Sequence, residues 1–266
     1  MTKPPAEARA AATILLVRNA ASGLEVFMVE RHHQIDFATG ALVFPGGKVD
    51  PGDAAPGLAA QCDGVDGLDD VARALRVAAI RETFEEAGVL LARPRGETAL
   101  VGGNRLREID AAHRDAFNRG ERTMSELVAS EGLTLALDAL VPFAHWITPQ
   151  FMPKRFDTHF FLVPAPPDQV AVHDGGESVD SVWITPDAAV AAAEAGERAV
   201  IFPTLMNVKK LGRSATVASA LDRARQGPII TVLPRIEDRD GEKWMVLPPD
   251  AGYEVSEAPV AALRGA

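Results

Sequence analysis

The 266-residue chain has very little cysteine, a single Cys62, and it has no apolar run near the roughly 18 to 20 residues that a membrane-spanning helix requires. One cysteine excludes an internal disulfide framework and is typical of a reducing compartment. The six histidines are scattered along the sequence, so we expect no metal site built from cysteine and histidine. These shortages leave carboxylates as the side chains from which a metal site could be built.

Targeting signals are also lacking. Residues 1–10 are polar and rich in alanine and proline, and we expect a flexible N-terminus there. The apolar run that follows is too short for a secretory signal peptide with a normal cleavage site. The last residues, Leu-Arg-Gly-Ala, are no peroxisomal address. We therefore expect a cytoplasmic protein.

Basic residues are in the minority, because 27 Lys and Arg face 37 Asp and Glu and give a formal net charge of −10. Such a charge disfavours nucleic acids and anionic membranes, which bind basic surfaces, so we expect neither as a partner. An anionic substrate would need metal ions to approach this chain. The hydrophobic content of 47% is ordinary for a globular protein, and the length suits one sizeable domain with elaborations.

Three carboxylates fall close together in residues 81–88, Arg-Glu-Thr-Phe-Glu-Glu-Ala-Gly. At about 100° per helical residue, Glu82, Glu85 and Glu86 share one narrow arc. The opposite side carries the apolar residues Val77, Ile80, Phe84 and Ala87. Like charges at this spacing cost a helix a few tenths of a kcal/mol each unless a cation neutralises them. Mg²⁺ would do so, since it accepts a few carboxylates and keeps positions for water and phosphate; a solvated acidic face is the alternative.

Read with the upstream Phe44-Pro45-Gly46-Gly47, this stretch resembles the Nudix box, the signature of the Nudix hydrolase family. The positions that match the box in type and order are Gly47, Arg81, Glu82, Glu85, Glu86, Gly88 and Val89. There are three departures. Asp53 stands where the box has Glu, Thr83 stands where it has an apolar residue, and 27 residues separate Asp53 from Arg81 where the box has seven. A box interrupted in this way is similar to that of the branch containing a coenzyme A diphosphatase.

The resemblance implies an α/β fold of the Nudix type, an α/β/α sandwich with a mixed sheet between helices. We expect the Nudix domain at residues 11–211, with a loop insertion at about 54–67 inside the box and a helical insertion at about 104–137. Residues 212–266 would form a C-terminal extension with a hairpin and a frayed tail. The helical insertion could shape substrate access; equally, it could pack on the edge of the sheet or form a contact in a homodimer.

Individual elements follow from periodicity and from capping residues. Strands are expected at 12–18, 25–31, 41–44, 141–148, 156–163 and 181–184. The box helix should begin at Asp69 or Asp70 and end at Gly88, with 89–93 then entering the sheet. Further helices are expected at 185–198 and 204–211, and a hairpin is expected from 229–233 and 243–247.

The resemblance also implies the site residues, with Mg²⁺ or Mn²⁺ as the cofactor. Glu85 and Glu86 would be direct metal ligands, and Glu82 would be a ligand or the base that accepts a proton from water. The Gly47 carbonyl would complete the metal shell, and both Gly46 and Gly47 would let the backbone approach substrate.

Four further residues complete the candidate site. Arg81 is predicted to point away from the centre of the acids and to orient Glu85 from behind, and the supporting contact of Asp53 is in doubt because its side chain is short. Glu177, in a glycine-rich stretch, stands where Nudix enzymes often supply another metal-binding carboxylate. Arg155 could contact a phosphate, although an ion pair with Asp157 is the favoured interpretation.

The expected reaction is metal-dependent hydrolysis of a diphosphate bond in a nucleotide-derived small molecule. The leading substrate is coenzyme A or an acyl-coenzyme A, cleaved to 3′,5′-ADP and (acyl-)phosphopantetheine. ADP-ribose, a dinucleotide or a sugar nucleotide remains an alternative substrate. A Nudix protein that senses nucleotides without hydrolysing them is a further alternative, and a purely structural or interaction module is the last.

Overall fold

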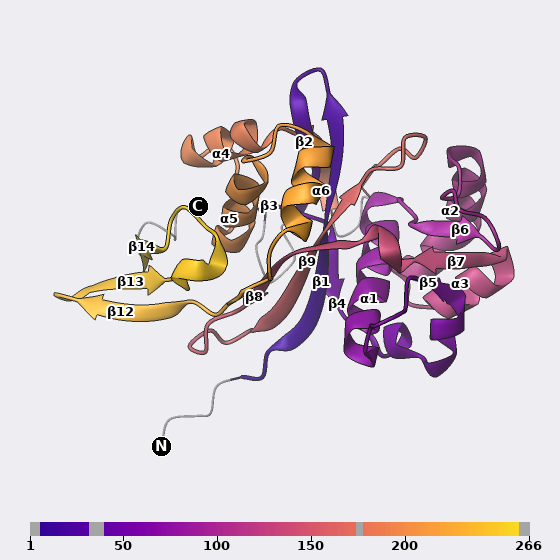
Figure 1. Ribbon diagram of the computed structural model, residues 1–266, viewed down its shortest axis with the longest axis horizontal. Helices are drawn as coiled ribbons and strands as arrows, with labels where there is room; N and C mark the ends of the chain where they lie inside the picture. Colours follow the sequence, from indigo (N-terminus) through magenta and orange to yellow (C-terminus); the bar gives the residue numbers. More distant parts are fainter. Residues whose placement is uncertain (1–5, 32–39, 174–177, 261–266) are drawn as a thin grey trace.

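An eight-stranded mixed sheet forms the centre of the structure, a computed structural model that describes residues 6–31, 40–173 and 178–260 (Figure 1). The strands are β1 (Arg9–Ala20), β2 (Gly23–Arg31), β3 (Leu42–Val43), β4 (Gly46–Lys48), β8 (Val141–Ile147), β9 (Phe156–Pro164), β10 (Ser178–Ile184) and β11 (Thr231–Val232). They lie in the order β10-β2-β1-β9-β8-β11, with β3 on β2 and β4 on β1. Because β1 runs antiparallel to β2 and parallel to β9, the sheet is mixed.

Helices cover both faces of this sheet, which confirms the predicted α/β architecture (Figure 1). Helix α1 (Asp70–Ala87) packs on one face; α4 (Pro186–Glu194), α5 (Phe202–Leu211) and α6 (Val217–Arg225) pack on the other. Strand β1 shows the consequence: Ile14 and Leu16 join the core under α1, while Leu15 and Val17 join the opposite core. Within the described ranges, no helix has the length and apolar content to cross a membrane.

Helix α1 begins and ends where the sequence predicts. The Asp69 carboxylate accepts a hydrogen bond from the Ala72 amide as the N-cap, and Gly88 ends the helix with a left-handed φ of 65°. Thr83 occupies the position where the Nudix box has an apolar residue, and it is fully buried. Its hydroxyl donates to the Ala79 carbonyl at 2.7 Å, so the buried polar group is satisfied inside the helix.

The two insertions form one subdomain beside α1, at the right of Figure 1. The predicted helical block consists of α2 (Gly103–Asn118) and α3 (Met124–Glu131), followed by β7 (Leu133–Ala136). Strand β7 pairs with β5 (Cys62–Asp63), which lies in the first insertion, and with β6 (Ala92–Pro94). The prediction that 89–93 enters the main sheet is therefore wrong. The chain after α1 instead joins a small sheet whose other strands come from the insertions.

The C-terminal extension begins with α6, which the sequence analysis did not predict, and then adds strand β11 to the main sheet. The predicted hairpin exists, but its strands are β12 (Arg235–Arg239) and β13 (Glu242–Val246), with β14 (Glu257–Pro259) on the far side of β13. The predicted partner at 229–233 is wrong because Pro234 interrupts the chain. Proline has no amide hydrogen for a strand ladder, so β11 and β12 belong to different sheets.

Candidate functional site

A cavity of about 1100 Å³ lies beside the acidic side of α1. Gly46, Gly47, Glu82 and Glu85 line one part of it. Its other walls are largely aromatic or apolar and come from the main sheet, the N-terminus of α5, the helical insertion and the hairpin; examples are Trp146, Phe160, Phe202, Phe117, Met124 and Met245. The predicted glycine turn and acidic helix thus meet at a cavity that also has an extended apolar surface.

The two glycines of the predicted site touch the glutamates directly. The Gly46 amide donates a hydrogen bond to Glu86 Oε2 at 3.0 Å. A Cβ atom on Gly47 would lie 2.3 Å from Glu82 Oε1, and one on Gly46 would lie 2.4 Å from the Ala12 carbonyl oxygen. A side chain at Gly46 would clash with the β1 backbone, and one at Gly47 would push the Glu82 carboxylate aside, so the glycines allow the turn to pack against the carboxylates.

Arg81 does not point away from the acids, and this part of the prediction is wrong. Its Nη1 donates to Glu82 Oε1 at 3.0 Å and to Glu85 Oε2 at 2.8 Å. Its Nη2 donates to the Lys48 carbonyl at 2.8 Å. Burial by itself lowers the pKa of Arg81, but the hydrogen bonds and charges of Asp53, Glu82 and Glu85 raise it overall. Arg81 is a buried permanent cation that holds two of the three glutamates.

Asp53 makes the supporting contact that its short side chain had put in doubt. Its two carboxylate oxygens accept from Arg81 Nε at 2.9 Å and Nη2 at 3.1 Å, and Oδ2 also accepts from the Asp50 amide at 2.8 Å. The 3₁₀ turn at Pro51–Ala54 carries Asp53 to this position, where it is 1% exposed. The backbone turn thus compensates for the missing methylene group.

The three glutamates have different surroundings. Glu82 and Glu85 line the cavity, whereas Glu86 is 5% exposed with its carboxylate on the glycine turn. Burial raises the pKa of Glu85 to about 8, although the charge of Arg81 opposes this and that of Glu82 adds to it. A divalent cation in the cavity would favour the ionised form of Glu85 and so lower its pKa.

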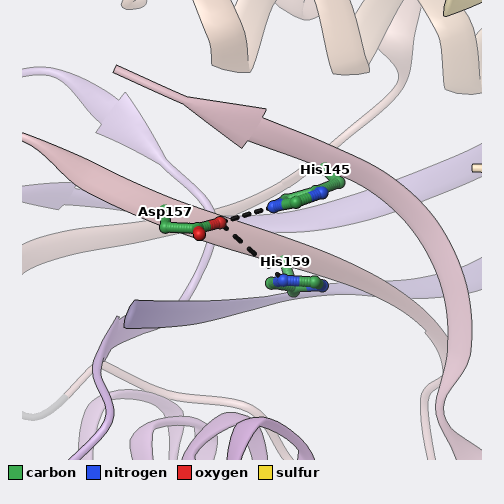
Figure 2. Close-up of side chains that lie close together, drawn as sticks. All are labelled: His145, Asp157 and His159. Carbon is green, nitrogen blue, oxygen red and sulfur yellow. Dashed lines mark hydrogen bonds and ion pairs between the residues drawn. The ribbon is translucent and has the colours of Figure 1, made fainter. Parts of the chain in front are cut away.

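Two further predicted site residues, Arg155 and Glu177, lie outside the Nudix box. The favoured pair of Arg155 with Asp157 is wrong: Arg155 donates to the carbonyls of Thr148 at 3.0 Å and Ala6 at 2.7 Å. Asp157 instead contacts His145 on β8 and His159 on its own strand, β9 (Figure 2). Glu177 lies outside the described residues.

Sequence reasoning missed two features. The aromatic cavity wall has no linear motif, since Trp146, Phe160 and Phe202 come from three separate elements. The histidines are not all scattered, because His145 and His159 lie directly opposite each other in neighbouring strands. His145 lies within the predicted strand 141–148. His159 lies within the predicted strand 156–163, two residues after Asp157. These positions were the signal that could have revealed the pair.

Comparison with known proteins adds the family. The sequence model of the NUDT19 Nudix domain matches residues 60–211, more than half of the chain. Human acyl-coenzyme A diphosphatase NUDT19 is 32% identical over 165 residues, which are 58% of this chain and 44% of that protein. Its Xenopus laevis counterpart is 25% identical over 211 residues, 65% of this chain and 56% of that protein. This chain thus spans about half the length of these curated relatives.

A solved structure is similar over most of the chain. The crystal structure of a Nudix hydrolase from Alicyclobacillus acidocaldarius is 29% identical, with a TM-score of 0.68. The similarity covers 84% of this chain and 99% of that one. It therefore extends to parts of the chain that lie outside the match to the NUDT19 domain.

Proposed function

This chain belongs to the NUDT19 Nudix domain family, and we propose that it uses Mg²⁺ or Mn²⁺ to hydrolyse the diphosphate bond of coenzyme A or an acyl-coenzyme A. The products would be 3′,5′-ADP and (acyl-)phosphopantetheine. The observation that carries the proposal is the continuity of the glutamate cluster with a long apolar wall in one cavity. The name of the human and frog relatives, acyl-coenzyme A diphosphatase, supports the same substrate class.

The donor set suits a hard divalent cation. Glu82, Glu85 and Glu86, with the Gly47 carbonyl, offer only oxygen atoms, which Mg²⁺ and Mn²⁺ prefer. Such an ion supplies Lewis-acid charge that neutralises the diphosphate oxygens during hydrolysis. Arg81 holds Glu82 and Glu85 in place through its Nη1 atom. Glu82 serves either as a further ligand or as the base that accepts the proton of the attacking water.

The cavity also suits a substrate with several phosphates and a long uncharged arm. Besides Arg81, four basic side chains line it in a chain whose net charge is −10: Arg9, Lys48, Arg122 and Lys154. They would bind the phosphates of the nucleotide part. The helical insertion contributes Phe117 and Met124 to the wall, which we assign to the pantetheine side. Coenzyme A combines both features, whereas ADP-ribose has a second sugar in place of the arm.

The rival proposal is a Nudix protein that binds nucleotides without hydrolysing them. The shortened Asp53 and the interrupted box were its main support. Asp53 keeps two hydrogen bonds to Arg81, and the interruption lies in the subdomain beside α1. Neither feature disturbs the three glutamates, so hydrolysis is the function we favour.

Product analysis tests the proposal. The purified chain is incubated with coenzyme A, acetyl-coenzyme A, ADP-ribose, NADH or diadenosine polyphosphates, each with Mg²⁺, Mn²⁺ or EDTA. We expect 3′,5′-ADP from coenzyme A or its acyl derivative only when metal is present. If only ADP-ribose is turned over, ADP-ribose replaces coenzyme A as the proposed substrate. Metal-dependent binding without turnover of any compound would establish the rival proposal, a protein that binds nucleotides without hydrolysing them.

Gly47→Ala should lower turnover by about ten- to a hundredfold, because the new methyl group would displace the Glu82 carboxylate. A displacement of a catalytic group by about 1 Å can reduce the rate by that factor. The matched control is Gly57→Ala, where a Cβ atom would meet nothing within 4 Å. Steady-state kinetics of both variants check the effect. Equal activity of the two would mean that Glu82 does not need its position against the glycine turn.

A further inference from the structure

A second cluster of metal-ligand side chains lies on β8 and β9, outside the candidate active site. It consists of His145, Asp157 and His159 (Figure 2). One ligand atom from each residue can be chosen so that all three lie within 4.8 Å of one another. Among the residues that the structure describes, no other group of three or more His, Cys, Asp and Glu side chains meets this criterion.

Strand geometry explains why the three side chains converge. Asp157 and His159 are two residues apart on β9, so both point to the same face of the sheet. His145 is the register partner of His159 on β8, and paired residues bring their side chains together. The two imidazole rings are stacked, with centroids 3.9 Å apart and an interplanar angle of 23°. A tight and partly preformed site results without any loop.

His145 Nε2 contacts Asp157 Oδ1, and His159 Nε2 lies 3.8 Å from the same oxygen. On the other side of the ring, His145 Nδ1 is 2.7 Å from the Thr231 hydroxyl of β11. Metal-binding histidines commonly have such a second partner, which fixes the ring and leaves the other nitrogen for the ion.

The cluster is also accessible to a cation. The side chains of Asp157 and His159 are about one third exposed, which gives an ion access from solvent.

From this geometry we propose that His145, Asp157 and His159 form a binding site for Zn²⁺ or a similar borderline transition metal, with a fourth position open to water. Two nitrogens and one oxygen match the preference of Zn²⁺, whereas Mg²⁺ prefers oxygen donors alone. The site is separate from the glutamate cluster and does not depend on the proposed diphosphatase function.

Its position indicates a structural role. Trp146 and Thr158 alternate with the cluster residues along the strands and line the cavity on the opposite face. Thr231 belongs to the C-terminal extension, so a metal ion here would join β8 and β9 and, through His145, hold β11 against them. Zinc binding on this face of the sheet would therefore stabilise the cavity wall that β8 and β9 form on the opposite face.

The test measures binding of Zn²⁺ to the full chain after treatment with EDTA, by equilibrium dialysis in the presence of excess Mg²⁺. We expect about one tightly bound zinc ion per chain. Replacement by Co²⁺ should give the visible absorption of a four-coordinate site. His159→Gln and His145→Gln should each weaken binding by at least about a hundredfold, since loss of a second partner alone costs ten- to a hundredfold.

Controls separate this site from the rest of the chain. Thr231→Val keeps all three ligands and should weaken zinc binding by about ten- to a hundredfold. His173→Gln, which removes a histidine outside the cluster, and Glu86→Gln, which alters the acidic site, should leave it unchanged. Far-ultraviolet circular dichroism shows whether each variant is folded. No zinc bound to the wild-type chain, or equal binding to folded His159→Gln, would overturn the proposal and leave a hydrogen-bonded His–Asp pair.

Discussion

Replacement of Glu86 by Gln is expected to lower turnover of the diphosphate substrate by about two to four powers of ten, because it removes a charge that the reaction requires. The fold should survive. The carboxamide oxygen of Gln can still accept the hydrogen bond that the Gly46 amide gives to Glu86 Oε2 at 3.0 Å. The change therefore removes charge with little change in shape, which separates a metal ligand from a merely structural acid.

The measurement for Glu86→Gln is kcat and KM across a titration of Mg²⁺, with thermal unfolding as the check on the fold. Glu108→Gln is the matched control, since Glu108 is an exposed acid on α2 with a surface pair to Arg105. The control should keep wild-type turnover. A loss below tenfold for Glu86→Gln would mean that Glu86 is no metal ligand, and a large loss with a lowered unfolding temperature would assign it to the structure of the glycine turn.

The contacts at the centre of the site could be predicted from the sequence only in part. The acidic arc on α1 and the glycine turn follow from residue type and spacing, since helical periodicity fixes the directions of Glu82, Glu85 and Glu86. The contact of Arg81 with Glu85 follows in the same way, because the two residues are four apart on α1. The contacts of Arg81 with Asp53 and with the Lys48 carbonyl do not follow, because these partners lie in other segments that only the folded chain brings to the helix.

Long-range pairing was the main limit for the insertions. Strands β5 and β7 are short, and their paired residues Cys62 and Leu135 are far apart in sequence. A two-residue strand has no periodicity from which it could be recognised, so only the folded chain shows that the two insertions form one sheet. The capping residues of α1 and α3, by contrast, act within four residues and are visible in the sequence.

The histidine cluster lay within reach of sequence reasoning. The predicted strands 141–148 and 156–163 contain His145 and His159, and an antiparallel pair joined by 149–155 would bring them opposite each other. The register shift between Pro142 and Ala144 lies on the far side of His145 from residues 149–155, so it does not alter this pairing. What the sequence does not reveal is the contact of His145 with the Thr231 hydroxyl, because Thr231 lies in a segment that was assigned to the hairpin.

Arg81→Ala is expected to lower the free energy of unfolding by about 3 to 5 kcal/mol, the usual cost of leaving a buried charge without its partner. Asp53 is 1% exposed and receives two hydrogen bonds from Arg81, so it bears most of this cost. Urea denaturation of the metal-free protein measures it. Arg119→Ala, which breaks an exposed pair with Glu121, should leave stability unchanged.

A double-mutant cycle shows whether the pair itself is responsible. Asp53→Asn removes the charge that Arg81 leaves behind, so the variant with both changes should be less destabilised than the sum of the single changes predicts. Arg81→Lys should recover little, because an ammonium group cannot donate in the forked geometry by which Arg81 reaches Asp53. If the two single effects simply add, Asp53 and Arg81 are not energetically coupled. The stability of the site would then come from the contacts of Arg81 with Glu82, Glu85 and the Lys48 carbonyl.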